Sequence, residues 1–243
     1  MPMPVLLPRV LALLLAALSI LGCSPAQGDG GETAIRKNLA ERVPALTQID
    51  EVRATPMPGL YEVRIGNDLL YSDAEGNYLI QGTLLDTRER RNLTEERIEK
   101  LTAIDFKDLR LEHAFTIVRG DGTRKLAVFE DPNCPYCKRF ERDLEKIDNI
   151  TIHTFLIPIL GPDSTEKSRR IWCSADRGKA WDDWMLRDVA PPSGPACDTA
   201  ALDANLAFAR KHNITGTPTL VFTDGRRVPG AINAQQIAQM LVP

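Results

Sequence analysis

The stretch EDPNCPYCKRF, residues 130–140, places two cysteines three positions apart where an apolar run gives way to a charged one. The residues just before it, 126–129, are apolar and predict a buried strand. A helix is expected over about 135–147, because apolar residues recur there at three- to four-residue spacing. A Cys-x-x-Cys motif between a strand and a helix is therefore the feature that decides the fold.

The position of the motif predicts different properties for its two thiols. Pro135 suits the first turn of a helix, where a missing backbone N–H costs nothing. Cys134 then lies at the helix N-terminus, where free N–H groups and the helix dipole lower its pKa below about 8.5. Cys137 follows almost one turn later, inside the helix. The motif thus predicts an exposed attacking thiol and a recessed resolving thiol.

Two other uses of a Cys-x-x-Cys pair are less well supported. A structural zinc site needs about four ligands, but Cys173 and Cys197 are isolated and the histidines (His113, His153, His212) lack short ligand spacing. No metal is therefore expected. An inert disulfide over three residues would close too small a loop to stabilise the fold much. A redox pair is the favoured interpretation.

The pattern around the motif is that of an α/β domain, assigned to residues 111–243. Apolar segments predict strands, and a helix-rich insertion at about 161–210 separates the first strands from the last. The strands are expected at 114–118, 126–129, 150–157 and 219–222, with a closing helix at 232–241. Strands alternating with helices in this way are typical of an α/β layout.

A smaller domain is expected before it, over residues 33–87. A short amphipathic helix ends at Pro44, and the alternating stretch 60–65 predicts a half-buried strand of an antiparallel sheet. A domain of about 55 residues has a marginal core, so a partner subunit could cover its apolar surface and sheet edge. The charged stretch 88–110 is interpreted as a linker helix between the two domains, with its N-terminus near Asn92.

The first 22 residues have the layout of a secretory signal peptide, with a positive end, an apolar run of about 12 residues and small residues after it. A flexible tether is expected over 23–32. Ile20 to Cys23 resembles a lipobox, which would leave a lipid on Cys23; alternatively, cleavage after Ala26 removes that cysteine. The net charge of −3 argues against a nucleic-acid surface.

The motif together with Gly216-Thr217-Pro218-Thr219 resembles the thioredoxin fold, in which a cis-proline loop faces the Cys-x-x-Cys pair. From about residue 33 onward the chain is similar to the DsbC/DsbG family of periplasmic thiol:disulfide interchange proteins, and most to DsbC. The segments that carry this resemblance are 71–82, 129–137, 171–176 and 216–230.

The resemblance implies an α+β, cystatin-like N-terminal dimerisation domain, joined by the linker helix to an α/β thioredoxin-like domain with the helical insertion. It implies Cys134 as nucleophile, Cys137 as resolving thiol, and substrate contacts at Thr217 and Pro218. Pro135 and Tyr136, inside the motif, complete the expected substrate site. Cys173 and Cys197 match the family's structural disulfide, and no cofactor is implied.

The function that follows is an exported disulfide isomerase, a homodimer in the periplasm that repairs misoxidised client proteins. A membrane reductase of the DsbD type would supply electrons. The Pro135-Tyr136 dipeptide leaves open a DsbG-like reductase or chaperone that protects single cysteines from sulfenic acid. Thioredoxins carry a buried acid six residues before the first cysteine, but Val128 stands there. Glu130 or Asp131 could transfer the proton of Cys137, or could simply cap the loop.

Overall fold

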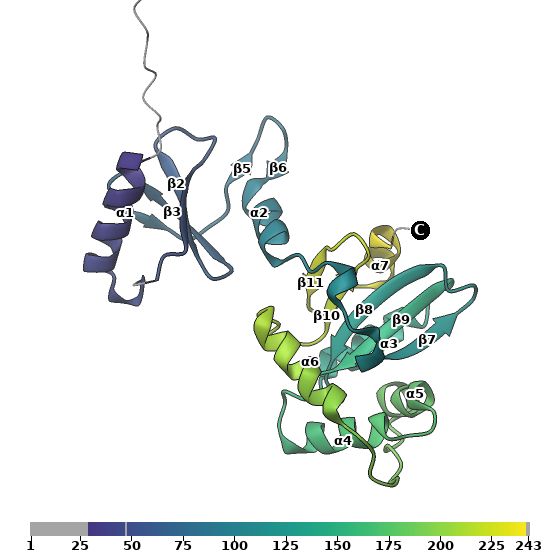
Figure 1. Cartoon of the computed structure of the whole chain (residues 1–243). Helices are drawn as coiled ribbons and strands as arrows, with labels where there is room; N and C mark the ends of the chain where they lie inside the picture. The colour runs from purple at the N-terminus through teal and green to yellow at the C-terminus, as the bar shows by residue number, and fades with distance from the viewer. Residues whose placement is uncertain (1–28, 47, 242–243) are drawn as a thin grey trace, which may run out of the picture. The chain divides into compact units, whose positions relative to one another are not determined.

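The computed structural model describes residues 29–46 and 48–241, which divide into two units. One unit comprises the described residues up to Ile65 together with Leu70–Ile80, and the second comprises Gly66–Leu69 and the chain from Gln81 onward (Figure 1). The expected signal peptide, Cys23 and most of the tether lie outside the described residues. No helix within the described residues has both the length and the apolar character needed to cross a membrane.

The N-terminal unit is a four-stranded sheet with one helix packed against it. Its core is formed by Ile35 and Leu39 from the helix and by Val52 and Val63 from the strands. The helix is α1 (Asp29–Arg42), followed by η1 (Pro44–Leu46), and the strand order is β1 (Glu51–Ala54), β2 (Leu60–Ile65), β3 (Asp68–Asp73), β4 (Leu79–Ile80). β1 pairs with β2 and β3 with β4, both antiparallel.

The prediction of a flexible tether is wrong for residues 29–32, because α1 already begins at Asp29. Glu32 pairs with Arg36 one turn later, with Oε1 2.8 Å from Nε. An acid in the first turn and an ion pair at four-residue spacing both stabilise a helix start. The polar composition of this segment thus belongs to a solvated helix end.

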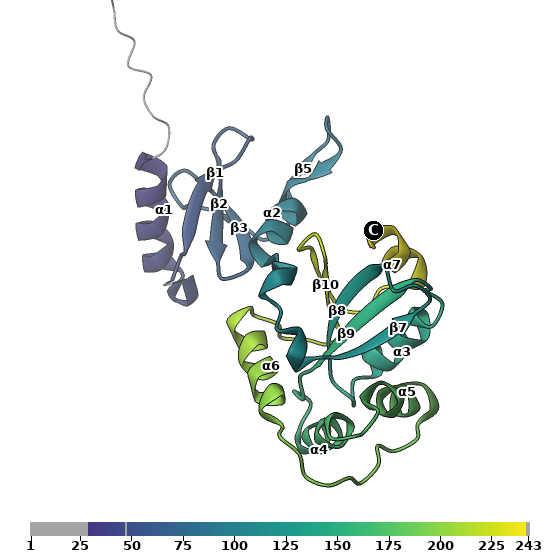
Figure 2. The ribbon, with the colours of Figure 1, turned by 45° about the vertical axis from the view of Figure 1, so that its right-hand side comes forward.

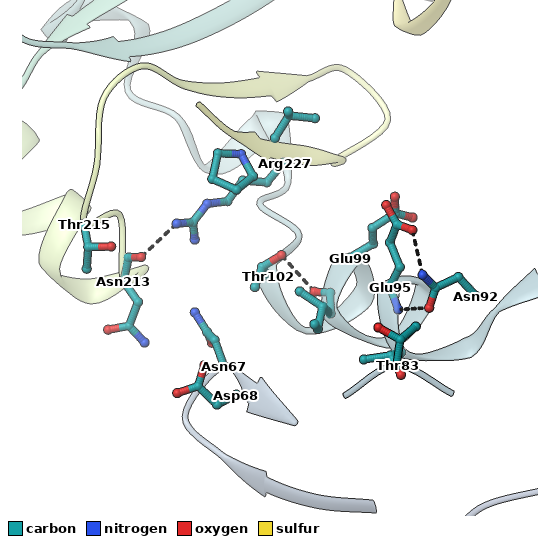
Figure 3. A pocket seen from close by; sticks show the side chains of 14 residues that line it. Asn67, Asp68, Thr83, Asn92, Glu95, Glu99, Thr102, Asn213, Thr215 and Arg227 are labelled. Carbon is teal, nitrogen blue, oxygen red and sulfur yellow. Dashed lines mark hydrogen bonds between the residues drawn. The ribbon is translucent and has the colours of Figure 1, made fainter. Parts of the chain in front are cut away.

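The prediction of a single linker helix over residues 88–110 is also wrong, because α2 covers only Leu93–Thr102. Before the helix a hairpin forms, in which Asp86 accepts the N–H groups of Arg88 and Glu89. Asn92 then caps the helix by accepting the N–H of Glu95 at 3.0 Å (Figure 3). The elements are β5 (Leu85–Asp86), β6 (Arg91–Asn92), α2 (Leu93–Thr102), η2 (Phe106–Asp108) and η3 (Leu111–His113).

The C-terminal unit is built on a five-stranded sheet in the order β11-β10-β8-β9-β7. β8 and β9 are parallel, and the other pairs are antiparallel. The strands are β7 (Phe115–Arg119), β8 (Arg124–Glu130), β9 (Ile150–Leu156), β10 (Thr219–Phe222) and β11 (Arg227–Pro229). The α/β class expected from the sequence is confirmed.

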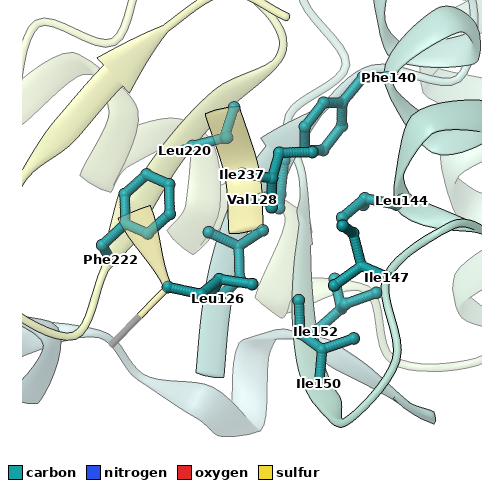
Figure 4. Close-up of a cluster of buried hydrophobic side chains, with 11 residues drawn as sticks. Leu126, Val128, Phe140, Leu144, Ile147, Ile150, Ile152, Leu220, Phe222 and Ile237 are labelled. Atoms are coloured by element: carbon teal, nitrogen blue, oxygen red, sulfur yellow. The ribbon is translucent and has the colours of Figure 1, made fainter. Parts of the chain in front are cut away.

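Helices cover both faces of this sheet (Figure 2). On one face α3 (Pro135–Leu144) and α7 (Ala234–Met240) pack over Leu126 and Val128 of the central strand (Figure 4). On the other face α6 (Ala200–Lys211) packs over Ala127 and Phe129. Alternate residues of β8 therefore face opposite layers, which explains its continuous apolar run.

The helical insertion holds α4 (Pro162–Trp172), α5 (Arg177–Arg187) and α6. Cys173, directly after α4, forms a disulfide with Cys197, with a Cα–Cα distance of 5.6 Å. α5 packs against α3, where Trp181 is fully buried. The insertion thus forms a wall beside the helix that carries the Cys-x-x-Cys motif.

Candidate active site

Cys134 is held at the start of α3 by backbone hydrogen bonds on both sides. Its N–H donates to the carbonyl of Asp131 at 3.0 Å, and its own carbonyl accepts the N–H of Lys138 at 3.1 Å. Cys134 is the N-cap residue, and its Sγ accepts the N–H of Cys137 at 3.4 Å. A sulfur atom in the N-cap position lies where a helix binds negative charge best.

These contacts lower the pKa of the Cys134 thiol to about 6. The largest cause is the hydrogen bond from the Cys137 side chain, while burial acts in the opposite direction. The Thr217 side chain and the backbone N–H groups of Cys137 and Tyr136 lower it further. At neutral pH Cys134 is therefore mostly thiolate, the nucleophilic form of cysteine.

The sequence-based picture of an exposed attacking thiol is wrong. Cys134 is only 3% exposed and Cys137 is fully buried. The Cys134 Sγ lies 3.2 Å from the carbonyl oxygen of Thr217, which is 83 residues further along the chain. The contact covers the sulfur from a side that the local sequence does not reveal.

The Thr217 loop reaches Cys134 because of the register between two strands. Thr219, the first residue of β10, pairs with Phe129 near the end of β8. The loop before β10 therefore lies beside the loop after β8, which carries the cysteines. The Thr217–Pro218 peptide bond is cis, at the position that the family resemblance implied.

The two acids before the motif differ sharply, although the sequence treated them together. Asp131 accepts four hydrogen bonds, from the N–H groups of Asn133, Ile159 and Leu160 and from the hydroxyl of Ser164, at 2.7–2.9 Å. It is thus a loop-capping carboxylate. Glu130 is fully buried, and no hydrogen bond of ordinary geometry from the described residues reaches either of its carboxyl oxygens.

The resolving thiol has a pKa raised far above its usual value, first by burial and then by the hydrogen bond it makes to Cys134. Cys137 is therefore a neutral thiol at every ordinary pH. The two sulfurs are chemically distinct, one ionised and one protonated. A proton must leave Cys137 before it can attack a disulfide.

The outer surface of the site is apolar at Tyr136, which is 62% exposed directly between the cysteines. Trp184 of α5 lies nearby and donates its Nε1–H to the carbonyl of Pro132 at 2.5 Å. The Nζ atoms of Lys138 and Lys167 lie 4.1 and 4.4 Å from its ring centroid. Trp184 was not singled out from the sequence, because its neighbours come from three separate segments.

The hollow drawn in Figure 3 lies away from the cysteines. It is lined by α2 together with Asn213, Thr215 and Arg227, and neither Cys134 nor Cys137 borders it. Among the described residues, no three His, Cys, Asp or Glu side chains gather closely enough to hold a metal ion. The Cys-x-x-Cys motif and its surrounding residues therefore form the candidate active site.

Comparison with known proteins agrees with this geometry. The family described as thioredoxin-like domain matches residues 111–242, and the disulfide bond isomerase protein N-terminal domain matches residues 26–95. A probable thiol:disulfide interchange protein DsbC of Bordetella pertussis is 47% identical over 213 residues, covering 88% of this chain and 75% of that protein. Its counterpart in Bordetella parapertussis is 46% identical with the same coverage.

A solved structure shows the same catalytic fold. The crystal structure of a disulfide interchange protein from Neisseria gonorrhoeae superposes with a TM-score of 0.52 and 40% sequence identity. The match covers 54% of this chain and 94% of that one.

Proposed function

The chain belongs to the DsbC family of thiol:disulfide interchange proteins, and from that premise we propose that Cys134 is the nucleophile through which it rearranges incorrect disulfides in clients. The observation that carries this proposal is the contrast between the two sulfurs. Cys134 has a pKa of about 6, whereas the pKa of Cys137 is strongly raised. One attacks as a thiolate while the other waits as a thiol.

The reaction begins when the Cys134 thiolate attacks one sulfur of a client disulfide. A bond forms between Cys134 and the client, and the second client sulfur leaves as a thiolate. That thiolate can attack elsewhere in the client, which frees Cys134 and leaves a rearranged disulfide. Alternatively Cys137 attacks Cys134, which releases a reduced client and oxidises the pair.

The client chain is held by the residues around the sulfurs. We assign this role to Thr217 and Pro218, whose loop contacts the Cys134 Sγ, and to Pro135 and Tyr136 within the motif. The exposed ring of Tyr136 offers apolar contact to an unfolded segment.

The dithiol form of the pair is the one needed for isomerisation, so an electron donor is required. We propose a membrane reductase of the DsbD type in the periplasm, with residues 1–22 as the export signal. Whether Cys23 carries a lipid is tested by labelling with palmitate: label on the mature wild type that disappears in Cys23→Ala establishes the anchor.

We further propose that the N-terminal domain, residues 33–87, joins two copies of the chain. β4 is the edge strand of its sheet, only two residues long, and its Ile80 is 51% exposed next to Tyr78 at 73%. An open edge with apolar side chains is a surface suited to strand pairing between copies. Sedimentation of Ile80→Asp should yield monomers where the wild type gives dimers.

The isomerase activity is tested with scrambled ribonuclease in the presence of a small thiol. Wild type should restore ribonuclease activity, whereas Cys134→Ala should not exceed the thiol alone. Equal recovery by both proteins would rule out the proposal. Trapping clients with Cys137→Ala separates the two substrate classes: multi-cysteine clients fit an isomerase, while single-cysteine clients fit the reductase suggested by Pro135-Tyr136.

A further inference from the structure

Two buried carboxyl groups lie beside the resolving thiol. Glu130 is the last residue of β8, and Glu141 follows Cys137 by four positions on α3, so Cys137 and Glu141 share one helix face. Both acids are at most 1% exposed. The Glu141 Oε1 accepts the indole N–H of Trp181 at 2.8 Å. No hydrogen bond of ordinary geometry from the described residues reaches either oxygen of Glu130 or the Oε2 of Glu141.

Two ionised carboxylates are not stable in such surroundings. Burying an unpaired charge is costly, and two like charges in one site push a proton onto one of them. Burial, followed by the charge of Glu141, raises the pKa of Glu130 well above its usual value. Burial also raises the pKa of Glu141, but its contacts with Glu130 and Trp181 oppose this. Glu130 therefore holds the shared proton, and Glu141 is the ionised member.

The charged neighbours of the pair agree with this assignment. Around Glu141, Arg119 favours the ionised form and Asp182 opposes it. Around Glu130, the groups that act are Glu141 and the two cysteines, and no cation is among its main influences. The negative charge of the pair is thus placed on the carboxyl that has the indole donor.

We propose that Glu130 and Glu141 form a proton relay that accepts the thiol proton of Cys137 when it attacks the mixed disulfide on Cys134. This inference rests on the proposed function, since it concerns the resolving step of that reaction. The carboxyl of Glu130 interacts with both Cys137 and Glu141, so we assign it the catalytic role of accepting the thiol proton, whereas Glu141 receives the second proton.

Protons and sulfur–sulfur bonds are conserved in this step. The Cys137 S–H passes its proton to one oxygen of Glu130, while the proton already on Glu130 moves to Glu141. The Cys137 thiolate attacks the Cys134 sulfur, so the Cys134–Cys137 bond forms and the client sulfur leaves as a thiolate, which takes a proton from water. When an electron donor later reduces the pair, the departing Cys137 thiolate recovers its proton from the relay.

The other acidic position near the motif cannot take this role. The side-chain oxygens of Asp131 are occupied by four donors that fix the loop. Val128, six residues before Cys134, lies in the apolar core beneath α3. The buried acid next to Cys137 is supplied instead from the end of β8 and from α3.

The relay is tested by stopped-flow reaction of the reduced protein with one equivalent of the aromatic disulfide DTNB. Attack by Cys134 releases one thionitrobenzoate, and attack by Cys137 releases the second, so the two rates are measured separately. In Glu130→Gln and Glu141→Gln we expect the first release, by Cys134, to keep its rate (the early rate). The second release, by Cys137, should be slower by roughly 100-fold at pH 7 (the late rate). Glu145→Gln, at the exposed end of the same helix, is the matched control and should match wild type in both.

The pH dependence separates proton transfer from structural damage. If the relay acts, the gap between wild type and Glu130→Gln narrows as pH rises, because hydroxide can then deprotonate Cys137 directly. An unchanged late rate in both variants would overturn the proposal, and so would a slowing that is equal at every pH. If wild type showed no early release of thionitrobenzoate, the result would instead contradict the role of Cys134.

A second measurement needs no variant that might fail to fold. The infrared difference spectrum between the dithiol and disulfide forms should show a gain of protonated carboxyl on oxidation, because the relay then holds the proton of Cys137. Absence of a carboxyl band from the wild-type difference spectrum overturns the relay. Disappearance of the band in Glu141→Gln, whose amide oxygen can still accept the Trp181 N–H, assigns it.

Discussion

The first cysteines of the two pairs in the C-terminal unit pack in one cluster but lie at opposite ends of helices. Cys134 caps the N-terminus of α3 and is free, whereas Cys173 caps the C-terminus of α4 and is bridged to Cys197. The positive end of a helix stabilises a thiolate, and the negative end disfavours one. The reactive pair thus combines burial with a helix N-terminus, whereas the structural pair joins a helix C-terminus to the exposed Cys197.

The largest effect should come from removing the nucleophile of the reactive pair. Cys134→Ser should lower isomerase turnover roughly a thousandfold or more, since no other thiolate lies in the site. Turnover is measured with scrambled ribonuclease, and circular dichroism checks the fold. If Cys173→Ser/Cys197→Ser lost as much turnover per folded molecule, the division of roles between the pairs would be wrong.

The structural pair should matter for stability instead. Its bridge spans a sequence separation of 24 residues, and closing such a loop is worth about 3 kcal/mol in the chain-entropy model. Urea unfolding of Cys173→Ser/Cys197→Ser should show a free energy of unfolding lower by about that amount. The reference protein is Cys134→Ser, which should unfold close to wild type at pH 5, where the Cys134 thiolate contributes almost no stability.

A smaller effect is expected from the carboxylate that holds the reactive loop. Asp131→Asn keeps the shape but weakens four hydrogen bonds to a charged acceptor, so we expect a loss of about 2 kcal/mol in stability. The same change at Asp143, a half-buried acid of α3 that pairs with the exposed Lys146, should be nearly neutral. Thermal unfolding of both variants compares them; equal melting temperatures would contradict the loop-holding role.

The last expected difference is that the alkylation rate of the reactive pair depends on pH, whereas the bridged pair does not titrate. With a pKa of about 6, Cys134 should react with iodoacetamide at a constant rate above pH 7 and lose about tenfold per pH unit below 6. Because the folded pKa is lowered from 9.0, the thiolate stabilises the reduced protein fully only above pH 9, and this gain is lost as pH falls through 6. A midpoint near 8.5 in wild type would contradict the helix-end argument.

Local patterns predicted much of this molecule. The strand at Leu60–Ile65 has the bounds expected from its alternation, and α3 begins at Pro135 as its turn chemistry implied. The Cys173–Cys197 bridge followed from family resemblance, since spacing alone leaves the pairing of four cysteines open.

Features that depend on distant contacts could not be predicted. The cover over Cys134 comes from Thr217, and the hydrogen bond to Glu141 comes from Trp181, 40 residues away. The separate roles of Glu130 and Asp131 also depend on which neighbours supply donors. The linker was misjudged for a different, local reason, because side-chain caps at Asp86 and Asn92 divide it into a hairpin and a short helix.

The covered position of Cys134 has a consequence for how this enzyme chooses its work. The sulfur of a residue that is only 3% exposed cannot be reached by the rounded surface of a folded protein. A narrow, extended strand can slip beside Tyr136 and reach it. Correctly folded molecules would then escape attack because of their shape, and the repair step would fall on chains that are still loose. Quality control would thus be a matter of steric access, exercised before any bond is broken.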